Sequence, residues 1–529
     1  GARVDACLAH QRGEHDARVF GLQLACLGRR KAAFDTLLTV LGGADQGVLD
    51  RSIQAAEDLP AIAACEDVAA LTAAVPPPDD RAIADEVARL RDELELARID
   101  QQMHRYDAGM AISARVLARA AELGYPPLEA EALYVHGSLL RHASRFDEAI
   151  ALLTRAVWRA DLVRDDRTLA RAMSLLVDAL SEGKAAYQEA LRWQPHADTV
   201  IGRLGPGSRE EAMLVSSFSS VLSNLNRGAE AMALARRAVT IAEAAYGPDD
   251  YRVAQFLDTL ARSHFQLGEF PQAAALVERE VAIAERHLGP GHPELAEAVG
   301  NLGAVHATAG DLARALPSFK RALALNQAAV GIDHPNLETD YLNLGELLGE
   351  LGEYAAAREH LERSLALAER THGVSHPRVG AVLRVLGGVL DGLGERAPAR
   401  AGLERAVAIF REVAPQNTLL TAGALSDLGW LESRVGDTRS AILHLEEALA
   451  LRIADPGGNE PALTPTIQFR LASLLRAGNA KDRARADALA EQALAALVGL
   501  DPGRHRETIA LLERWRDERA SSGPRRGRR

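Results

Sequence analysis

Three histidines that could bind a metal ion recur at a fixed interval. His292, His334 and His376 lie 42 residues apart, and each directly precedes a proline. Imidazole nitrogens are common ligands of zinc and other transition metals. If each interval is a pair of helices packed roughly 8–10 Å apart, equivalent atoms in successive pairs are too far apart to share one ion. We therefore expect these residues to cap the helix that follows, and we predict no metal site.

Short motifs of common catalytic chemistry are absent from the sequence. It has no His-Glu-x-x-His pattern, no Gly-x-x-x-x-Gly-Lys-Ser/Thr phosphate loop and no Gly-x-Ser-x-Gly nucleophile turn. The glycines between Gly202 and Gly207 lack dinucleotide-binding spacing and are interpreted as a turn. Acidic pairs such as Glu278 and Glu280 are interpreted as charged helix faces that favour solubility. We expect no catalytic residues, no cofactor and no enzymatic activity within this chain.

The three cysteines, Cys7, Cys26 and Cys65, all lie in the first 65 residues. Their number is odd and their spacing is not that of a zinc site. We favour buried reduced thiols. The alternative is a Cys26–Cys65 disulfide, which would require this region to lie outside the cytoplasm.

The net charge of −12 disfavours nucleic acid as a partner, because an acidic surface repels phosphates. The basic run from Arg525 to Arg529 is interpreted as a solvated tail. The sequence contains no stretch of 18 apolar residues, so we predict no membrane span within it. We expect a cytoplasmic location, with a tether through a membrane helix upstream of the chain as the alternative. Because the chain begins at Gly1 without Met, we expect it to be a piece of a longer polypeptide or a processed product.

The 42-residue interval organises most of the chain. Gly247, Gly289, Gly331 and Gly373 begin four related turns at this spacing. Within each unit a Leu-Gly pair, a later Gly and an Ala recur in register, as in Leu344-Gly345, Gly352 and Ala357. Such a period indicates one supersecondary unit stacked on copies of itself. Only 4% of the residues are aromatic, and the small apolar side chains favour closely stacked helices over a sheet.

Each recurring position has a physical interpretation. Glycine inside a helix is costly, so the one in the Leu-Gly pair must permit a close helix approach. The glycine seven residues later is predicted to form a left-handed C-cap. A large apolar residue follows the alanine by four positions and is expected to fill the space between units; these residues are Phe319, Leu361, Leu403 and Leu445. Pro293, Pro335 and Pro377 suit the first turn of a helix.

We predict an all-α fold, an α-α superhelix preceded by a small N-terminal helical region. Residues 1–75 form that region, with one helix from about Val48 to Leu59, and the prolines of residues 76–80 form a linker. Ten helix pairs are expected in residues 81–498, of which the segment 168–203 fits the pattern poorly. A capping helix is predicted for residues 499–521, with Trp515 in its apolar face, and a basic disordered tail for residues 522–529.

The repeated residues resemble the tetratricopeptide repeat. The pattern is met by His136-Gly137, Phe146, Ala149, Leu153 and Ala156, and again by Leu344-Gly345, Gly352, Tyr354, Ala357 and Leu361. The 42-residue length with Gly-x-x-His-Pro between units is similar to the kinesin light chain type. Departures include Phe218-Ser219 and Leu260-Ala261 in place of Leu-Gly, and Glu280 where Ala is expected. The resemblance covers about residues 81–498 and implies a solenoid that binds a protein or peptide in its concave groove.

The resemblance also implies candidate groove residues. Asn301 and Asn343 occupy the same place in two units, just before Leu-Gly, where an amide would hold a peptide backbone. Arg262, Glu346, Arg384 and Trp430 are each taken to follow the Leu-Gly pair or its equivalent and would line the same surface. For the asparagines the alternative is a polar residue on a solvated face, and for Trp430 it is packing between units.

A second resemblance concerns the N-terminal region. Its motifs are Cys7-Leu-Ala-His10, Arg12-Gly-Glu14, Leu24-Ala-Cys26-Leu27 and Ala64-Cys65-Glu-Asp-Val68, followed by the three prolines. These resemble the segment that joins a kinase to a repeat array in bacterial serine/threonine protein kinases of the myxobacterial kind. We therefore expect a scaffold that recruits targets within a bacterial signalling protein. The alternatives are the non-catalytic C-terminal portion of such a kinase, with its catalytic domain upstream of Gly1, and a sensor of a peptide ligand.

Overall fold

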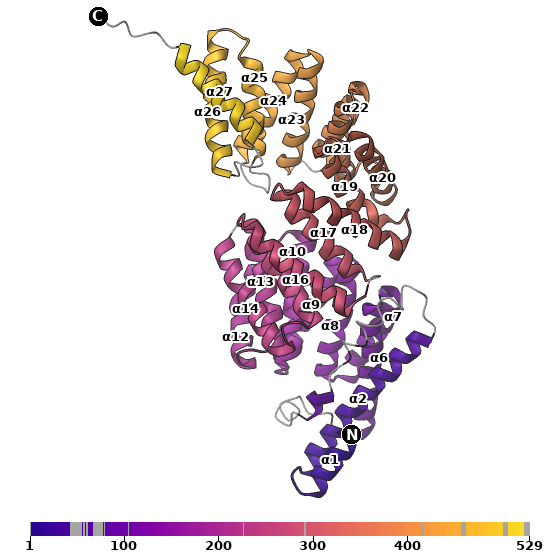
Figure 1. Ribbon diagram of the computed structural model, residues 1–529. Coiled ribbons are helices and arrows are strands. Elements are labelled where there is room, and N and C mark those ends of the chain that lie inside the picture. Colours follow the sequence, from indigo (N-terminus) through magenta and orange to yellow (C-terminus); the bar gives the residue numbers. More distant parts are fainter. Residues whose placement is uncertain are drawn as a thin grey trace, which may run out of the picture. The chain divides into compact units, whose positions relative to one another are not determined.

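The structure is a computed structural model and describes most of the chain (Figure 1). Most of the predicted helix from Val48 to Leu59, most of the proline linker and all but the first residue of the basic tail lie outside the described residues. The described residues are 2–42, 56, 59, 62–66, 78, 80–103, 105–225, 227–289, 292–413, 417–455, 462–500 and 506–522.

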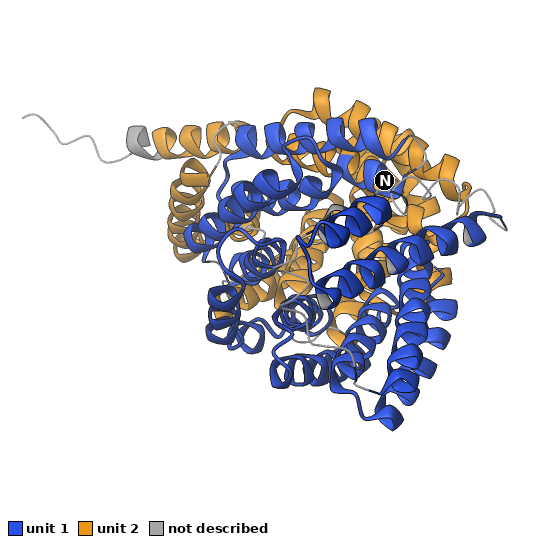
Figure 2. Ribbon diagram, turned by 90° about the horizontal axis from the view of Figure 1, so that it is seen from below, with its two compact units in different colours: residues 1–298 blue, residues 299–529 orange. Residues whose placement is uncertain are grey.

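The described residues form helices and short 3-10 turns, without a strand among them, and the chain divides into two compact units (Figure 2). The first unit comprises residues 1–298 and the second residues 299–529. The fold is thus an all-α repeat solenoid, as predicted. No helix in the described residues is both long enough and apolar enough to cross a membrane.

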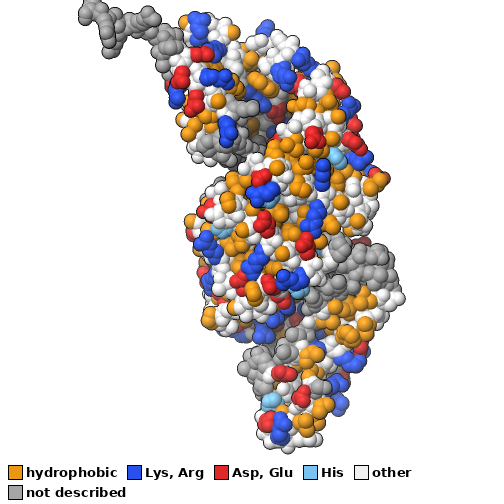
Figure 3. Space-filling view, viewed as in Figure 1, with side chains coloured by type: hydrophobic (Ala, Val, Ile, Leu, Met, Phe, Trp, Pro, Cys, Tyr) orange, Lys and Arg blue, Asp and Glu red, His pale blue; other side chains and the backbone are white. Residues whose placement is uncertain are grey.

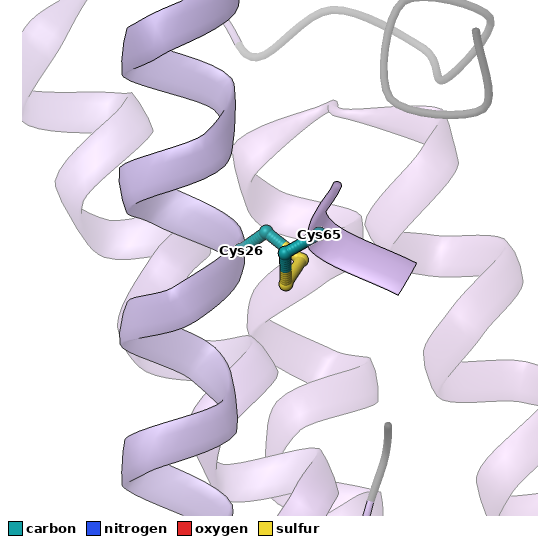
Figure 4. Close-up of a disulfide and its surroundings, with 2 residues drawn as sticks. All are labelled: Cys26 and Cys65. Carbon is teal, nitrogen blue, oxygen red and sulfur yellow. A yellow bond between two sulfur atoms is a disulfide. The ribbon is translucent and has the colours of Figure 1, made fainter. Parts of the chain in front are cut away.

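The N-terminal region contains α1 (Ala2–Gln11), α2 (Ala17–Gly42) and a 3-10 turn, η1 (Ile62–Cys65). A disulfide between Cys26 and Cys65 joins α2 to η1 across a separation of 39 residues (Figure 4). The favoured interpretation of reduced thiols is therefore wrong for these two residues, and the alternative pairing is the one formed. The sequence alone could not decide between reduced thiols and this disulfide, because only the fold brings η1 back against α2. Cys7 is a free, partly exposed thiol.

Helices follow in antiparallel succession through the rest of the first unit. Asp80 caps the first of them by accepting hydrogen bonds from the backbone N–H groups of Ala82 and Ile83 at 2.8 and 3.1 Å. In the poorly matched segment the second helix of the pair is broken into two short pieces. The helices are α6 (Arg81–Gln102), α7 (Tyr106–Leu123), α8 (Pro126–His142), α9 (Phe146–Leu162), α10 (Asp166–Lys184), α11 (Tyr187–Leu191), α12 (Gln194–Leu204), α13 (Arg209–Asn224), α14 (Gly228–Tyr246), η2 (Tyr251–Val253), α15 (Ala254–Gln266), α16 (Phe270–His287) and α17 (Pro293–Thr308), which extends into the second unit.

The second unit continues the alternation around one apolar core that runs from Ala315 to Trp515. Ile509, Leu512 and Trp515 pack the final helix onto this core, whereas Leu511 is exposed. The helices are α18 (Leu312–Val330), η3 (Pro335–Leu337), α19 (Glu338–Glu350), α20 (Tyr354–His372), α21 (Pro377–Gly392), α22 (Arg396–Val413), α23 (Thr418–Val435), α24 (Thr438–Ala454), α25 (Leu463–Leu475), α26 (Ala480–Leu500) and α27 (Arg506–Ser522).

The glycine of each Leu-Gly pair allows a close helix approach, as predicted. A Cβ atom on Gly345 would lie 2.6 Å from Cγ of Leu361, and one on Gly387 would lie 2.7 Å from Cγ of Leu403. Real Cβ atoms do not approach so closely, so any larger residue would require the leucine side chain or its helix to shift. The contact that requires glycine is therefore within a unit, between α19 and α20 and between α21 and α22.

The linker histidines cap helices, as predicted. In each case the ring nitrogen Nδ1 accepts a hydrogen bond of 3.2 Å from the backbone N–H two residues later, which belongs to Glu294, Asn336 or Arg378. The glycines that close the first helices are also confirmed as left-handed, with φ of 78° at Gly352 and 81° at Gly394. Capping and left-handed glycines together fix where each helix begins and ends.

Candidate functional site: a hollow across the first helices of the second unit

A hollow of about 390 Å³ lies within the second unit. Most of its lining comes from α19, α21, α23 and α25, the first helices of four successive pairs, and Tyr354 and Leu403 are added from second helices. Three of the six predicted groove residues, Glu346, Arg384 and Trp430, line it.

The hollow lies where one unit lacks a side chain. Glu346 follows Leu344-Gly345, Trp430 follows Leu428-Gly429, and Gly388 occupies the same place in the unit between them. A Cβ atom on Gly388 would meet no atom within 4 Å, unlike one on its neighbour Gly387. Gly388 is thus an open part of the lining, between the positions of a carboxylate and an indole.

One wall of the hollow holds two arginines that share a carboxylate. Arg470 Nη1 donates to Asp427 Oδ1 at 2.9 Å and to Ser426 Oγ at 2.8 Å. Arg384 Nη1 lies 3.7 Å from Asp427 Oδ2. The Arg470 guanidinium also lies 5.6 Å from the centroid of the Trp430 ring, which is cation–π distance. These contacts hold the indole and both arginines in place without a ligand.

A second ion pair places a buried carboxylate in the lining. Arg434 Nη1 lies 2.5 Å from Oδ2 of Asp391, whose side chain is only 10% exposed. The other oxygen, Oδ1, is buried and accepts no hydrogen bond. On α19, Glu346 and Glu350 are exposed and one turn apart. In total, four carboxylates and three guanidinium groups line the hollow, so its lining carries an excess of negative charge.

The other three predicted residues do not line this hollow. Asn343 is half-buried on α19 and Asn301 is half-buried on α17. Arg262 lies on α15 in the first unit, where it pairs with Asp258 on its own helix.

The sequence analysis missed Gly388 and every charged residue of the hollow other than Glu346 and Arg384, namely Glu350, Asp391, Asp427, Arg434 and Arg470. The 42-residue register could have identified Gly388, because it aligns with Glu346 and Trp430. The placement of Arg384 after the Leu-Gly pair is wrong, because Arg384 precedes Leu386-Gly387 by two residues. Gly388 is the counterpart of Glu346 in that unit.

Glu280 is a buried acid outside the hollow, on α16 of the first unit. Its side chain is 9% exposed, and Oε2 has no hydrogen-bond partner. Burial, together with the charges of Asp258, Glu297 and Glu294, raises the pKa of Glu280 to about 9. The interpretation of Glu278 and Glu280 as a charged solvated face is therefore wrong for Glu280, although Glu278 is exposed. In the register of the repeat Glu280 occupies the place of Ala322 and Ala406, which face the core.

Charged side chains of both signs are interspersed on the molecular face drawn in Figure 3. Neither sign forms a continuous stripe among the described side chains of that face.

Models of the tetratricopeptide repeat match three parts of the chain. They cover residues 94–166, residues 213–251 and 253–294, and residues 294–369 and 336–412. These segments include α19, α20, α21 and most of α22. No curated protein matches the sequence.

Several solved structures share the helical repeat architecture over part of the chain. Kinesin light chain TPR-like repeats from Podosopora anserina are 22% identical, cover 38% of this chain and 95% of their own, and have a TM-score of 0.35. BtubC from P. vanneervenii is 22% identical over 44% of this chain and 91% of its own, with a TM-score of 0.36. Aspartyl phosphate phosphatase F from Bacillus subtilis is 14% identical, covers 70% of this chain and 95% of its own, and has a TM-score of 0.45.

The assignment to a family rests on the repeat models and on the helix geometry. The matched segments contain the glycine contacts and the helix caps that the repeat requires. The chain therefore carries tetratricopeptide repeats.

Proposed function

We propose that this chain is a protein-interaction scaffold that binds a peptide segment of its partner along α19, α21, α23 and α25. The observation that supports this most strongly is the hollow, because side chains from four successive repeats converge on it. Solenoids generally bind extended segments on such continuous surfaces. Trp430, held by Arg470, provides the kind of rigid aromatic anchor that dominates many interfaces.

The remaining predicted groove residues belong to the same proposal. Asn343, on α19, would contact the peptide backbone beside the hollow. Asn301 and Arg262 would contact more distant parts of a long ligand, along the array of residues 81–498. Their contribution is expected to be smaller than that of the residues lining the hollow.

Selection of peptides from a random library tests the scaffold function. The full chain is immobilised, 12-residue peptides are selected, and the affinity of labelled peptides is measured by fluorescence anisotropy. Trp430→Ala is expected to weaken binding at least about tenfold, as for a hot-spot residue. Leu511→Ala, an exposed apolar residue on α27, is the matched control and should bind normally. Equal affinity of all three proteins would contradict the proposal.

We further propose that the scaffold recruits targets within a bacterial signalling protein, linked to a serine/threonine kinase domain. The motifs around Cys7, Cys26 and Cys65 support this through their resemblance to such kinases. The size of the native polypeptide, measured with antibodies against this chain, tests the linkage. A species large enough to hold a kinase domain, with kinase activity in the immunoprecipitate, is expected. A native polypeptide of the size of this chain would contradict it.

The disulfide bears on location. A Cys26–Cys65 bond favours a compartment that does not reduce it, and hence the tethered alternative over the cytoplasm. Alkylation of thiols in intact cells before lysis tests this preference. Protection of Cys26 and Cys65, with Cys7 labelled, supports the alternative, and labelling of all three cysteines supports the cytoplasm.

A peptide-sensing role is the remaining alternative. It would require the array to change its dimensions when a peptide binds. Small-angle scattering of the full chain, with and without a selected peptide, measures this directly. An unchanged radius of gyration at saturation would leave the scaffold function and exclude the sensor.

A further inference from the structure

The shape of the hollow indicates that it receives a single side chain of the ligand. Gly388 is the only one of three equivalent positions without a side chain, and the space above its Cα is open. Glu346 on α19 and Trp430 on α23 flank it at the equivalent positions, and Val385 and Val389 add apolar surface on α21. A helical glycine here is otherwise unfavourable, since nothing packs close enough to require it.

The charges of the hollow select among possible side chains. The donors of Arg470 and Arg434 are engaged by Asp427 and Asp391. An incoming carboxylate would have to compete with these internal partners. It would also meet an excess of negative charge in the lining, where four carboxylates face three guanidinium groups.

The buried carboxylate of Asp391 adds a specific attraction for a cation. Its Oδ2 is paired with Arg434, whereas Oδ1 is buried and accepts no hydrogen bond. A carboxylate that is only partly compensated in a low-dielectric site attracts positive charge more strongly than one in water. The exposed Glu346 and Glu350 lie on α19, which also lines the hollow, and there they would contact the head of a long cationic side chain.

We propose that the hollow at Gly388 is a pocket for one basic side chain, arginine or lysine, of the bound peptide. The aliphatic stem lies along Val385, Val389 and the Trp430 ring, and the cationic head lies beside Glu346 and Glu350, where the buried charge of Asp391 also attracts it. This inference rests on the proposed function, because it names the anchor residue of the same ligand.

The test uses peptides selected on the full chain from the random library. The expected consensus contains one invariant arginine or lysine. Each labelled peptide is then compared with a version in which that residue is exchanged for citrulline, which keeps the shape of arginine without its charge, or for norleucine in the case of lysine. Loss of the charge is expected to weaken binding at least about tenfold, the lower end of the effect of losing a close ion pair at an interface.

Substitutions in the protein locate the effect. Gly388→Leu fills the hollow without a clash at Cβ and is expected to reduce affinity at least about tenfold, as blocking an anchor site would. Gly202→Leu, at an exposed helical glycine of α12 that also has open space at Cβ, is the matched control and should bind normally. Helical circular dichroism and thermal unfolding confirm that both variants fold.

A charge variant completes the test. In Glu346→Gln/Glu350→Gln, the exchange of the basic residue for its neutral analogue should have a smaller effect than in the wild type. Selected peptides that lose affinity for Gly388→Leu but have an acidic or aromatic anchor would overturn the basic pocket and leave the scaffold function. Peptides that bind Gly388→Leu as well as they bind the wild type would overturn the pocket, and a failure to select any peptide would contradict the scaffold function itself.

Discussion

Replacing Glu280 with alanine is expected to stabilise the first unit, increasingly so as the pH rises. The substitution restores the residue found at Ala322 and Ala406 in the equivalent positions of other repeats. It removes a carboxyl that is 9% exposed and whose Oε2 has no hydrogen-bond partner. A buried polar group without a partner destabilises the folded state, because unfolding returns it to water.

The magnitude follows from the pKa shift. The pKa of Glu280 is raised from 4.5 to about 9, mainly by burial and next by Asp258 and Glu297. Between these two values the folded chain binds the proton more tightly than the unfolded chain, so stability falls as the pH rises. One pKa unit corresponds to about 1.4 kcal/mol, so the loss is about 3 kcal/mol between pH 4.5 and 7 and about 6 kcal/mol at most by pH 9.

Urea unfolding followed by circular dichroism between pH 5 and pH 9 measures the effect. Many other groups titrate in this range, so the informative quantity is the difference between wild type and variant at each pH. Glu280→Gln keeps the size of the side chain and removes the titration. Its stability relative to the wild type should rise with pH in the same way as that of Glu280→Ala.

Glu278→Gln, an exposed neighbour on the same helix, is the control and should follow the wild type at every pH. If the stability difference between Glu280→Gln and the wild type does not change from pH 5 to pH 9, the reasoning about a buried, protonated carboxyl is refuted.

Three further predictions concern the repeats and the N-terminal region. Gly387→Ala should destabilise the second unit by about 1–3 kcal/mol through overpacking against Leu403. Gly388→Ala has open space at Cβ and should stabilise the unit by up to about 1 kcal/mol. Urea unfolding of the two variants measures the difference. Burial, and next the charges of His372 and Arg378, lower the pKa of His376, so its contribution to stability is lost as the pH falls below about 6.5, the unfolded value. The variant His376→Asn keeps a capping group and should lose less thermal stability than the wild type between pH 7 and pH 5. An equal loss in both proteins would contradict the capping role. Reduction of the Cys26–Cys65 bond removes a constraint that contributes about 4 kcal/mol for a loop of this length. Protease should therefore cleave the N-terminal region faster in dithiothreitol. The Cys26→Ser/Cys65→Ser variant should be cleaved at that faster rate in the absence of dithiothreitol.

The repeats could be predicted because each recurring residue has a local physical role. Gly352 is needed for a left-handed turn, Gly345 for a close helix contact, and His334 for a cap, and each of these depends on atoms within one unit. Because these constraints are local, the same residue types recur at the same positions in successive repeats.

The site was only partly predictable because it depends on residues from different repeats. Glu346, Arg384 and Trp430 were identified from their position beside Leu-Gly. Gly388 could not be recognised by a functional side chain, because its contribution to the hollow is that it has none. The Arg470–Asp427 pair spans 43 residues and crosses a segment where the 42-residue register weakens.

The burial of Glu280 and the Cys26–Cys65 pairing were not predicted correctly from the sequence. Glu280 was recognised as a departure from Ala, but its charge suggested exposure, and only the packing of α15, α16 and α17 shows that it is buried. The pairing of Cys26 with Cys65 depends on how the chain returns to α2, which no local pattern records.

Amide hydrogen exchange of the full chain with and without a selected peptide, read by mass spectrometry, shows directly which helices contact the peptide. We predict slower exchange in α19, α21 and α23, around Glu346, Gly388 and Trp430, with little change in α20, α22 and α24. Protection confined to those second helices or to the first unit would contradict this prediction.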